Sequence, residues 1–188
     1  MDVSVFVDQI RDHYVSAYQE AAENHRKKNS VSIMEGIIEL PKKDGIPNAF
    51  RLWRMDLAAN IDGEAKFSEF NHDSHLQFSP FHFTYSKQLN VKMNPVSWNG
   101  VEFEYSDSDI DTNLFENWAN KWIDVEEKLG LGGYVHNITY PECKDGECTF
   151  SVDFGSASAY SFFELLEIFA NYKIENVTVH SRTAHGQS

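Results

Sequence analysis

Apolar residues recur at every third or fourth position across residues 3–28, which is the spacing of an amphipathic helix. One face of this segment collects Phe6, Ile10, Tyr14, Ala17 and Ala21. Asp2 can cap the start of the helix, and the basic residues at 26–28 suit the negative end of its dipole. Asn29 can take the left-handed conformation that often closes a helix. The pattern therefore predicts an N-terminal helix with one buried face.

Residues 31–106 change to short runs of alternating apolar and polar positions, which are typical of strands. Strands are expected near residues 31–40, 49–60, 64–71, 76–86, 88–98 and 101–106. Turn-forming residues lie between them, with a hairpin turn at Asp62-Gly63 and a loop over residues 41–47. Successive strands joined by short turns predict an antiparallel β-meander.

Asn99-Gly100 gives the strongest turn pattern in this region, because both residues accept the positive φ angles of a two-residue hairpin. Counting outward from the turn pairs Trp98 with Val101 and Val96 with Phe103. Large apolar side chains would then share one face of the sheet. We therefore expect the last two strands of the meander to form a hairpin here.

Residues 112–129 have the clearest helical pattern in the second half of the chain. One arc of this helix holds Leu114, Phe115, Trp118, Trp122, Val125 and Leu129, and Gly130 follows as a stop. Strands are expected near 134–141 and 148–154, then a helix near 158–172 and a last strand at 176–180. Together with the strand at 101–106, this is the β-α-β-β-α-β order of a ferredoxin-like unit.

These elements predict an α+β protein built as a two-layer α/β sandwich. A length of 188 residues fits one domain, with possible halves at 1–98 and 99–182 and a short tail at 183–188. Hydrophobic residues make up 41% of the chain, and 14 of them are Phe, which is enough for a large core. The start of the chain lacks the pattern of a secretory signal, and no run approaches the ~18 apolar residues that span a bilayer. We therefore expect a cytoplasmic protein.

Acidic residues dominate the charge of the chain, with a net value of −13. Lys121 is the only base between residues 102 and 127, and the same stretch holds Glu102, Glu104, Asp107, Asp109, Asp111, Glu116, Asp124, Glu126 and Glu127. A field of one sign repels nucleic acid phosphates and anionic membranes and attracts basic partners. The residues expected on a loop or on the outer face of the helix are the candidate partner-binding set: Asp107, Asp109, Asp111, Glu116, Asp124 and Glu127.

Cys143 and Cys148 are the only cysteines, and two hairpin registers are possible between them. A two-residue turn at Asp145-Gly146 would place them opposite each other at a spacing that a disulfide can close. That register turns Ile138 toward the wrong face of the sheet. A three-residue loop pairs Ile138 with Val152 and separates the two sulfur atoms, because a one-residue slip reverses the face of every side chain. The apolar pattern favours this second register and free thiols.

The remaining motifs carry little chemistry. His72, His75 and His82 lie close together in sequence, but they fall in a turn and a strand and lack the spacing of a metal site on a helix. The calcium-loop pattern beginning at Asp107 fails, since Thr112 and Trp118 occupy the positions that need Gly and Glu. No catalytic, cofactor or metal motif is recognisable, so we predict none of these.

The sequence thus favours a non-enzymatic acidic binding protein of the inhibitor or toxin-immunity type, which engages a basic protein partner. One alternative is a small-ligand-binding protein or an enzyme with its site over the meander sheet. Its polar residues would be His72, His75, His82, Arg51 and Arg54. Another alternative is a structural protein whose aromatic-rich sheet forms an oligomer interface.

Overall fold

The N-terminal helix α1 (Val3–Lys28) has the predicted bounds in the computed structural model, which describes residues 2–29, 32–70, 76–106, 110–131 and 133–181. The Asp2 carboxylate accepts the Ser4 N–H at 3.0 Å and so caps the helix as expected. Asn29 is extended, with a φ of −123°, so its predicted left-handed conformation is wrong. The buried face consists of Val7, Ile10, Tyr14, Val15, Tyr18 and Ala22.

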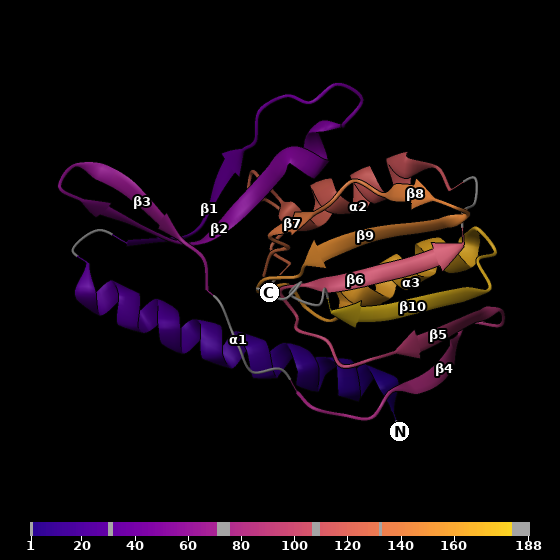
Figure 1. Cartoon of the computed structure of the whole chain (residues 1–188). Helices are drawn as coiled ribbons and strands as arrows, with labels where there is room; N and C mark the ends of the chain where they lie inside the picture. Colours follow the sequence, from indigo (N-terminus) through magenta and orange to yellow (C-terminus); the bar gives the residue numbers. More distant parts are fainter. Residues whose placement is uncertain (1, 30–31, 71–75, 107–109, 132, 182–188) are drawn as a thin grey trace, which may run out of the picture.

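Three antiparallel strands form sheet A, in the order β1 (Ser32–Glu39), β2 (Leu52–Ile61) and β3 (Glu64–Ser68). The predicted hairpin at Asp62-Gly63 is confirmed: Ile61 pairs with Glu64, and both turn residues have positive φ angles. Between β1 and β2 the chain runs through the predicted loop, which ends in a short 3-10 helix, η1 (Asn48–Arg51). In Figure 1, sheet A stands apart from the larger sheet and above the C-terminal half of α1.

Sheet B has seven strands, and its main path runs β4-β5-β10-β6-β9-β7. Their bounds are β4 (Phe81–Tyr85), β5 (Leu89–Met93), β6 (Val101–Ser106), β7 (Asn137–Ile138), β9 (Glu147–Asp153) and β10 (Asn176–Ser181), and β8 (Glu142–Lys144) pairs with β9. The β5–β10 pairing is parallel and the others are antiparallel, so the sheet is mixed. Helices α2 (Thr112–Ile123) and α3 (Tyr160–Asn171) cover one face (Figure 1).

The continuous meander is wrong at two places. β3 and β4 belong to different sheets, and β10 lies between β5 and β6. Asn99-Gly100 does form a turn, in which the Gly100 N–H donates to the Ser97 carbonyl at 3.0 Å, but no hairpin follows. Phe103 pairs with Val179 and Phe150 in place of Val96. The distant strand β10 thus takes the place beside β6 that the local hairpin would have given to the segment before Asn99.

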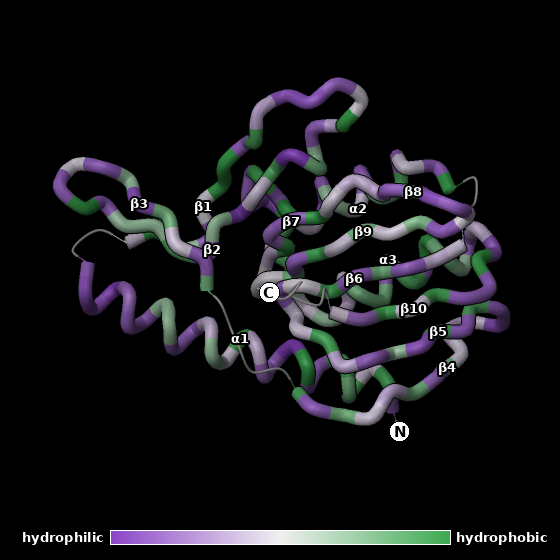
Figure 2. The backbone as a smooth tube through the Cα atoms, viewed as in Figure 1, coloured by the Kyte–Doolittle hydropathy of each residue, from purple (hydrophilic) through white to green (hydrophobic). Residues whose placement is uncertain are grey.

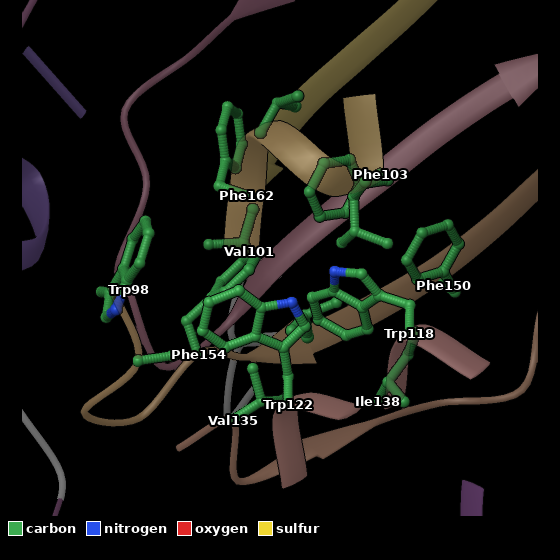
Figure 3. Close-up of a cluster of buried hydrophobic side chains, with 14 of the residues drawn as sticks. Trp98, Val101, Phe103, Trp118, Trp122, Val135, Ile138, Phe150, Phe154 and Phe162 are labelled. Carbon is green, nitrogen blue, oxygen red and sulfur yellow. The ribbon is translucent and has the colours of Figure 1, made fainter. Parts of the chain in front are cut away.

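Tryptophans of α2 face the core, as predicted. Figure 3 shows Trp118 and Trp122 directed into the same cluster as Phe150 and Phe154, and the rings of Trp118 and Phe154 meet edge to face at 6.1 Å. The helix ends at Ile123, however, six residues before the predicted end. Asp124 takes the left-handed conformation with a φ of 42°, which leaves Val125 and Leu129 47% and 53% exposed. These two residues therefore do not belong to the core face.

No helix within the described ranges combines the length and the apolar character that a bilayer crossing requires. The longest, α1, has 26 residues, but hydrophilic positions occur throughout it (Figure 2). Its first turns pack on sheet B, where the Phe6 ring meets the Phe81 ring edge to face at 5.3 Å. Residues from α1 and from both sheets share one buried hydrophobic cluster.

Cys143 and Cys148 form a disulfide, so the prediction of free thiols is wrong. Cys143 pairs with Cys148 across a two-residue turn, whereas Ile138 pairs with Val152 in the register of the longer loop. The register shifts by one residue between β7 and β8, and this shift buries Ile138 while the cysteines remain opposite each other. The prediction assumed a single register along the hairpin, whereas β9 pairs with β7 in one register and with β8 in the other.

We expect the unfolded, unreduced protein to show no free thiol in a titration and to show two after reduction. Replacing both cysteines with serine should lower the free energy of unfolding by about 2 kcal/mol, because the closed loop is short. Urea unfolding with and without reductant measures this difference. Two reactive thiols in the unreduced protein would contradict the disulfide.

Candidate functional site

His136 lies where the two sheets meet, and its backbone connects them. Its carbonyl accepts the Arg54 N–H of β2 at 2.8 Å, and its own N–H donates to the Asp153 carbonyl of β9 at 2.9 Å. The side chain is completely buried. A buried polar group without a partner is costly, and a buried charge without a countercharge is more so. The groups around this imidazole therefore determine whether it carries a proton on both nitrogens.

Carboxylates contact both ring nitrogens of His136. Nδ1 lies 2.9 Å from Asp56 Oδ1 and 3.8 Å from Asp153 Oδ2, and Nε2 lies 3.3 Å from Glu35 Oε1. Burial opposes a charge on the ring, but Asp153, Asp56 and Glu35 outweigh it and raise the pKa of His136 to about 10. An imidazolium fits this arrangement, because its charge is balanced by carboxylates on both sides of the ring, and Nε2 can donate to Glu35.

Glu35 is held in an unusual backbone conformation by this cluster. It lies inside β1 with a φ of 54°, a region that non-glycine residues rarely adopt. Its Oε1 accepts hydrogen bonds from the Ser156 hydroxyl and from His136. Burial works against its charge, but these two bonds and the positive charges of His136 and Arg54 together outweigh burial and lower the pKa of Glu35. Backbone strain of this kind is concentrated at functional sites.

Gly155 allows the imidazole to pack directly against the backbone. Its φ is +48°, and a Cβ at this position would lie 2.2 Å from His136 Cδ2. A side chain here would therefore displace the ring from its carboxylate partners. The Gly155 N–H also donates to Asp153 Oδ1 at 2.9 Å, which fixes that carboxylate beside His136.

Arg54 is the second buried cation and is 1% exposed. Its guanidinium donates to the carbonyls of Glu35, Ile123 and Asp124, each at 2.7 Å. The Tyr134 ring lies 3.9 Å below the guanidinium carbon, and Glu127 Oε1 is 3.3 Å from Nη1. Arg54 thus connects sheet A to the end of α2. A guanidinium suits these acceptors because it is planar and carries five N–H donors.

A cavity of about 430 Å³ opens beside this cluster, between β2 and the strands β7 and β9. Asp56, Glu69 and Asp153 are the acidic residues that line it, and no Lys, Arg or His is among the lining residues that the structure describes. The remaining wall has flat or aliphatic side chains (Leu40, Phe50, Leu52, Trp53, Phe70, Ile138, Val152), the polar side chains Asn99, Asn137, Thr139 and Ser151, and Gly100. We call this cavity the acidic pocket.

Asp153 is the carboxylate of the acidic pocket with the most perturbed titration. Burial raises its pKa to about 7, the charge of Asp56 adds to the effect, and His136 opposes it. Asp56 already accepts the Phe70 N–H at 2.7 Å and contacts His136. A cation entering the pocket would favour the ionised form of Asp153 and would compete with its proton.

The predicted partner-binding residues do not form one surface in the described part of the chain. Asp124 is buried, so its expected place on the outer helix face is wrong; its carboxylate accepts the N–H groups of Lys128 and Leu129. Glu127 contacts Arg54, and Asp111 caps α2 by accepting the Asn113 N–H at 3.0 Å. Glu116 is half-buried on α2. Asp107 and Asp109 lie outside the described residues.

The alternative site over the meander is only partly visible. His72 and His75 lie outside the described residues, and His82 is exposed on β4 opposite Lys92. Arg51 and Arg54 are both buried in sheet A and its preceding turn, where their guanidinium groups are engaged. In the part of the chain that the structure describes, no group of three or more His, Cys, Asp or Glu is arranged to hold a metal ion.

A second cavity, of about 470 Å³, lies over α2 and α3 and is reached by Tyr85 of β4. Several of its polar side chains are already paired with each other. Lys121 lies 2.6 Å from Glu164, and the Tyr85 hydroxyl donates to Glu167 at 3.1 Å. The acidic pocket, where like charges face one cavity, is therefore the stronger candidate for a ligand site.

Comparison of the chain with protein-family models, with curated proteins and with solved structures gave no significant match. The site must therefore be interpreted from its own geometry.

Sequence reasoning missed the central residue of this site, His136. Two features could have indicated it. Arg54 and Asp56 occupy alternate positions in a strand that is otherwise apolar, and charged residues in such a strand need buried partners. His136 follows Val135 and precedes Ile138 in another strand that is expected to be buried. Neither feature says that the two strands meet.

Proposed function

We propose that this chain is a non-enzymatic binding protein of the inhibitor or toxin-immunity type, which engages a basic protein partner through the acidic pocket. The observation that carries the proposal is that Asp56, Glu69 and Asp153 line one cavity, and that the described residues around it include no lining cation. His136 already contacts Asp56 and Asp153 from inside the protein, so a basic side chain of the partner would balance the acidic charge that remains, above all that of the exposed Glu69. The net charge of −13 would assist by speeding the encounter and by disfavouring nucleic acid.

The acidic pocket replaces part of the surface that the sequence suggested. Asp124 accepts the Lys128 N–H at the end of α2, and Glu127 contacts Arg54. Their removal would therefore disturb the fold as well as the binding of a partner. Glu69 is exposed and lines the pocket. It can meet a partner without loss of structure.

We also infer that the unit from β6 to β10 is ferredoxin-like. The neighbours β10-β6-β9-β7 and the two helices on one face support this inference. The cytoplasmic location stays a prediction. The Cys143–Cys148 disulfide weighs against it, since disulfides persist more readily in oxidising compartments.

A basic peptide tests the proposal. We expect a capped decapeptide of arginine, lysine and glycine to bind and to shift the backbone amide resonances of Asn99, Gly100 and Ser151, which line the pocket. Replacing Glu69 with Gln and Asp153 with Asn together should weaken binding about tenfold or more, because a partly desolvated charge pair contributes more than ~1.4 kcal/mol. Titration calorimetry at physiological salt gives the affinities.

The matched control carries Glu142→Gln and Glu147→Gln, which remove the same charge from the exposed β8–β9 hairpin. Its affinity should stay within about twofold of the parent chain, because exposed charges interact weakly in salt. Binding should also tighten between pH 6 and 8, as Asp153 with its pKa of about 7 loses its proton. An equal loss in both variants would show diffuse attraction and would refute the pocket.

A further inference from the structure

We propose that the group received by the acidic pocket is the guanidinium of an arginine side chain, which the pocket prefers over the ammonium of lysine. This inference rests on the proposed function and specifies the partner's contacting residue. The preference follows from the distribution of acceptors, from the shape of the walls and from the way in which this fold already treats its own basic residues.

Acceptors in the pocket come from several directions. Asp56 lies on β2, Glu69 follows β3, and Asp153 ends β9, so the carboxylates enter from three separate segments. Asn99, Asn137, Thr139 and Ser151 also line the cavity, although the Thr139 hydroxyl already accepts the Ser151 N–H at 2.8 Å. A guanidinium offers five N–H donors spread in one plane, whereas an ammonium offers three from one point. Dispersed acceptors therefore suit arginine.

The walls between these acceptors are flat and apolar. Phe50, Trp53 and Phe70 line the cavity together with Leu52 and Val152. A guanidinium is weakly hydrated and stacks on aromatic faces, whereas an ammonium keeps its water tightly. Entry of lysine would remove hydration that these walls cannot replace. The apolar walls and the dispersed acceptors therefore both favour arginine over lysine.

Of the four arginines that the structure describes, Arg51 and Arg54 are buried, Arg11 is half-buried and Arg26 is exposed. Arg54 combines an aromatic face, three carbonyls and a carboxylate around one guanidinium. Every lysine that the structure describes is exposed, except Lys121, which is half-buried. The surroundings of Arg54 thus combine an aromatic ring with several oxygen acceptors, which is the combination that we propose for a guanidinium in the pocket.

Three capped tripeptides test the preference: glycine-arginine-glycine, glycine-lysine-glycine and glycine-citrulline-glycine. Dissociation constants come from resonance shifts of the Asn99, Gly100 and Ser151 amides at pH 8. We expect the arginine peptide to bind about tenfold more tightly than the lysine peptide, and the neutral citrulline peptide to bind more weakly than both. Glu69→Gln should weaken the arginine peptide, while the exposed control Glu142→Gln should leave it unchanged.

The outcomes separate this inference from the proposed function. Equal or tighter binding of the lysine peptide would overturn the arginine preference and leave a pocket for basic side chains. Failure of both basic peptides to shift the pocket resonances, together with failure of the basic decapeptide, would overturn both proposals. Arginine binding that is unchanged by Glu69→Gln and by Asp153→Asn would place the peptide elsewhere and would overturn the inference. Because Glu69 is exposed, its variant tests the site without a risk to folding.

Discussion

His136→Leu is expected to lower the free energy of unfolding by about 3–5 kcal/mol at pH 6, since it removes one partner of a buried charge cluster. Glu35, Asp56 and Asp153 would remain around an apolar side chain, and the two carboxylates nearest to Nδ1 would lose their shared cation. Leucine is close to histidine in volume, so the loss would report charge and hydrogen bonding more than a cavity. Urea unfolding followed by tryptophan fluorescence measures it.

The pH dependence of stability gives a second measurement of the same group. The folded pKa of about 10 lies above the ordinary value of 6.5, so the protonated ring favours the folded state. The contribution of His136 is therefore lost as the pH rises from 6.5 to about 10, and the part that comes from Asp153 also falls below pH 7, where that carboxyl gains a proton. The difference in stability between the parent chain and His136→Leu should narrow over that window.

An exposed histidine provides the control. His82→Leu on β4 should change the unfolding free energy by about 0.5 kcal/mol or less, because surface substitutions rarely exceed that value. A loss below ~1 kcal/mol in His136→Leu, or a difference from the parent chain that does not depend on pH, would contradict an imidazolium in the cluster.

Arg54→Met should cost a similar ~3–5 kcal/mol, because a buried cation with several partners cannot be truncated without leaving them unsatisfied. The carbonyls of Glu35, Ile123 and Asp124 would each lose the donor that Arg54 supplies. Methionine keeps much of the length and apolar volume of arginine. The change therefore isolates the guanidinium.

Hydrogen exchange locates the effect of Arg54→Met. The amides of Lys128 and Leu129, which bond to the Asp124 carboxylate, should lose protection first, because Arg54 holds Asp124 in place. Arg26→Met, at the exposed C-terminal turn of α1, is the matched control and should cost about 1 kcal/mol or less. Equal losses in the two variants would show that Arg54 does not connect sheet A to α2.

The sequence predicted elements with local causes well and pairings with distant causes poorly. The helix at 3–28, the hairpin at Asp62-Gly63 and the buried tryptophans of α2 follow from periodicity and turn chemistry within a few residues. The hairpin at Asn99-Gly100 had equally good local chemistry, but β10 entered the sheet beside β6. A strand can pair with a segment far along the chain instead of with its neighbour in sequence, and the local pattern of residues does not show which partner it takes.

The disulfide illustrates a different limit. A two-residue turn at Asp145-Gly146 was one possible register, and the apolar pattern at Ile138 favoured another. Both were correct over part of the strand, because a one-residue shift between β7 and β8 changes the register. Such shifts depend on how the strand packs against its neighbours. A prediction that assumes one register must therefore reject either the disulfide or the burial of Ile138, although both are present.

The sequence by itself determined the helices, most strands, the acidic balance and the apolar face of α2, because these properties are carried by neighbouring residues. Only the tertiary structure decided that His136, Glu35, Asp56 and Asp153 meet, and that Asp124 is buried. The physical reason is that a charge can be buried only where groups from distant segments neutralise it. Which segments those are depends on how sheet A packs against sheet B, and the same packing forms the acidic pocket.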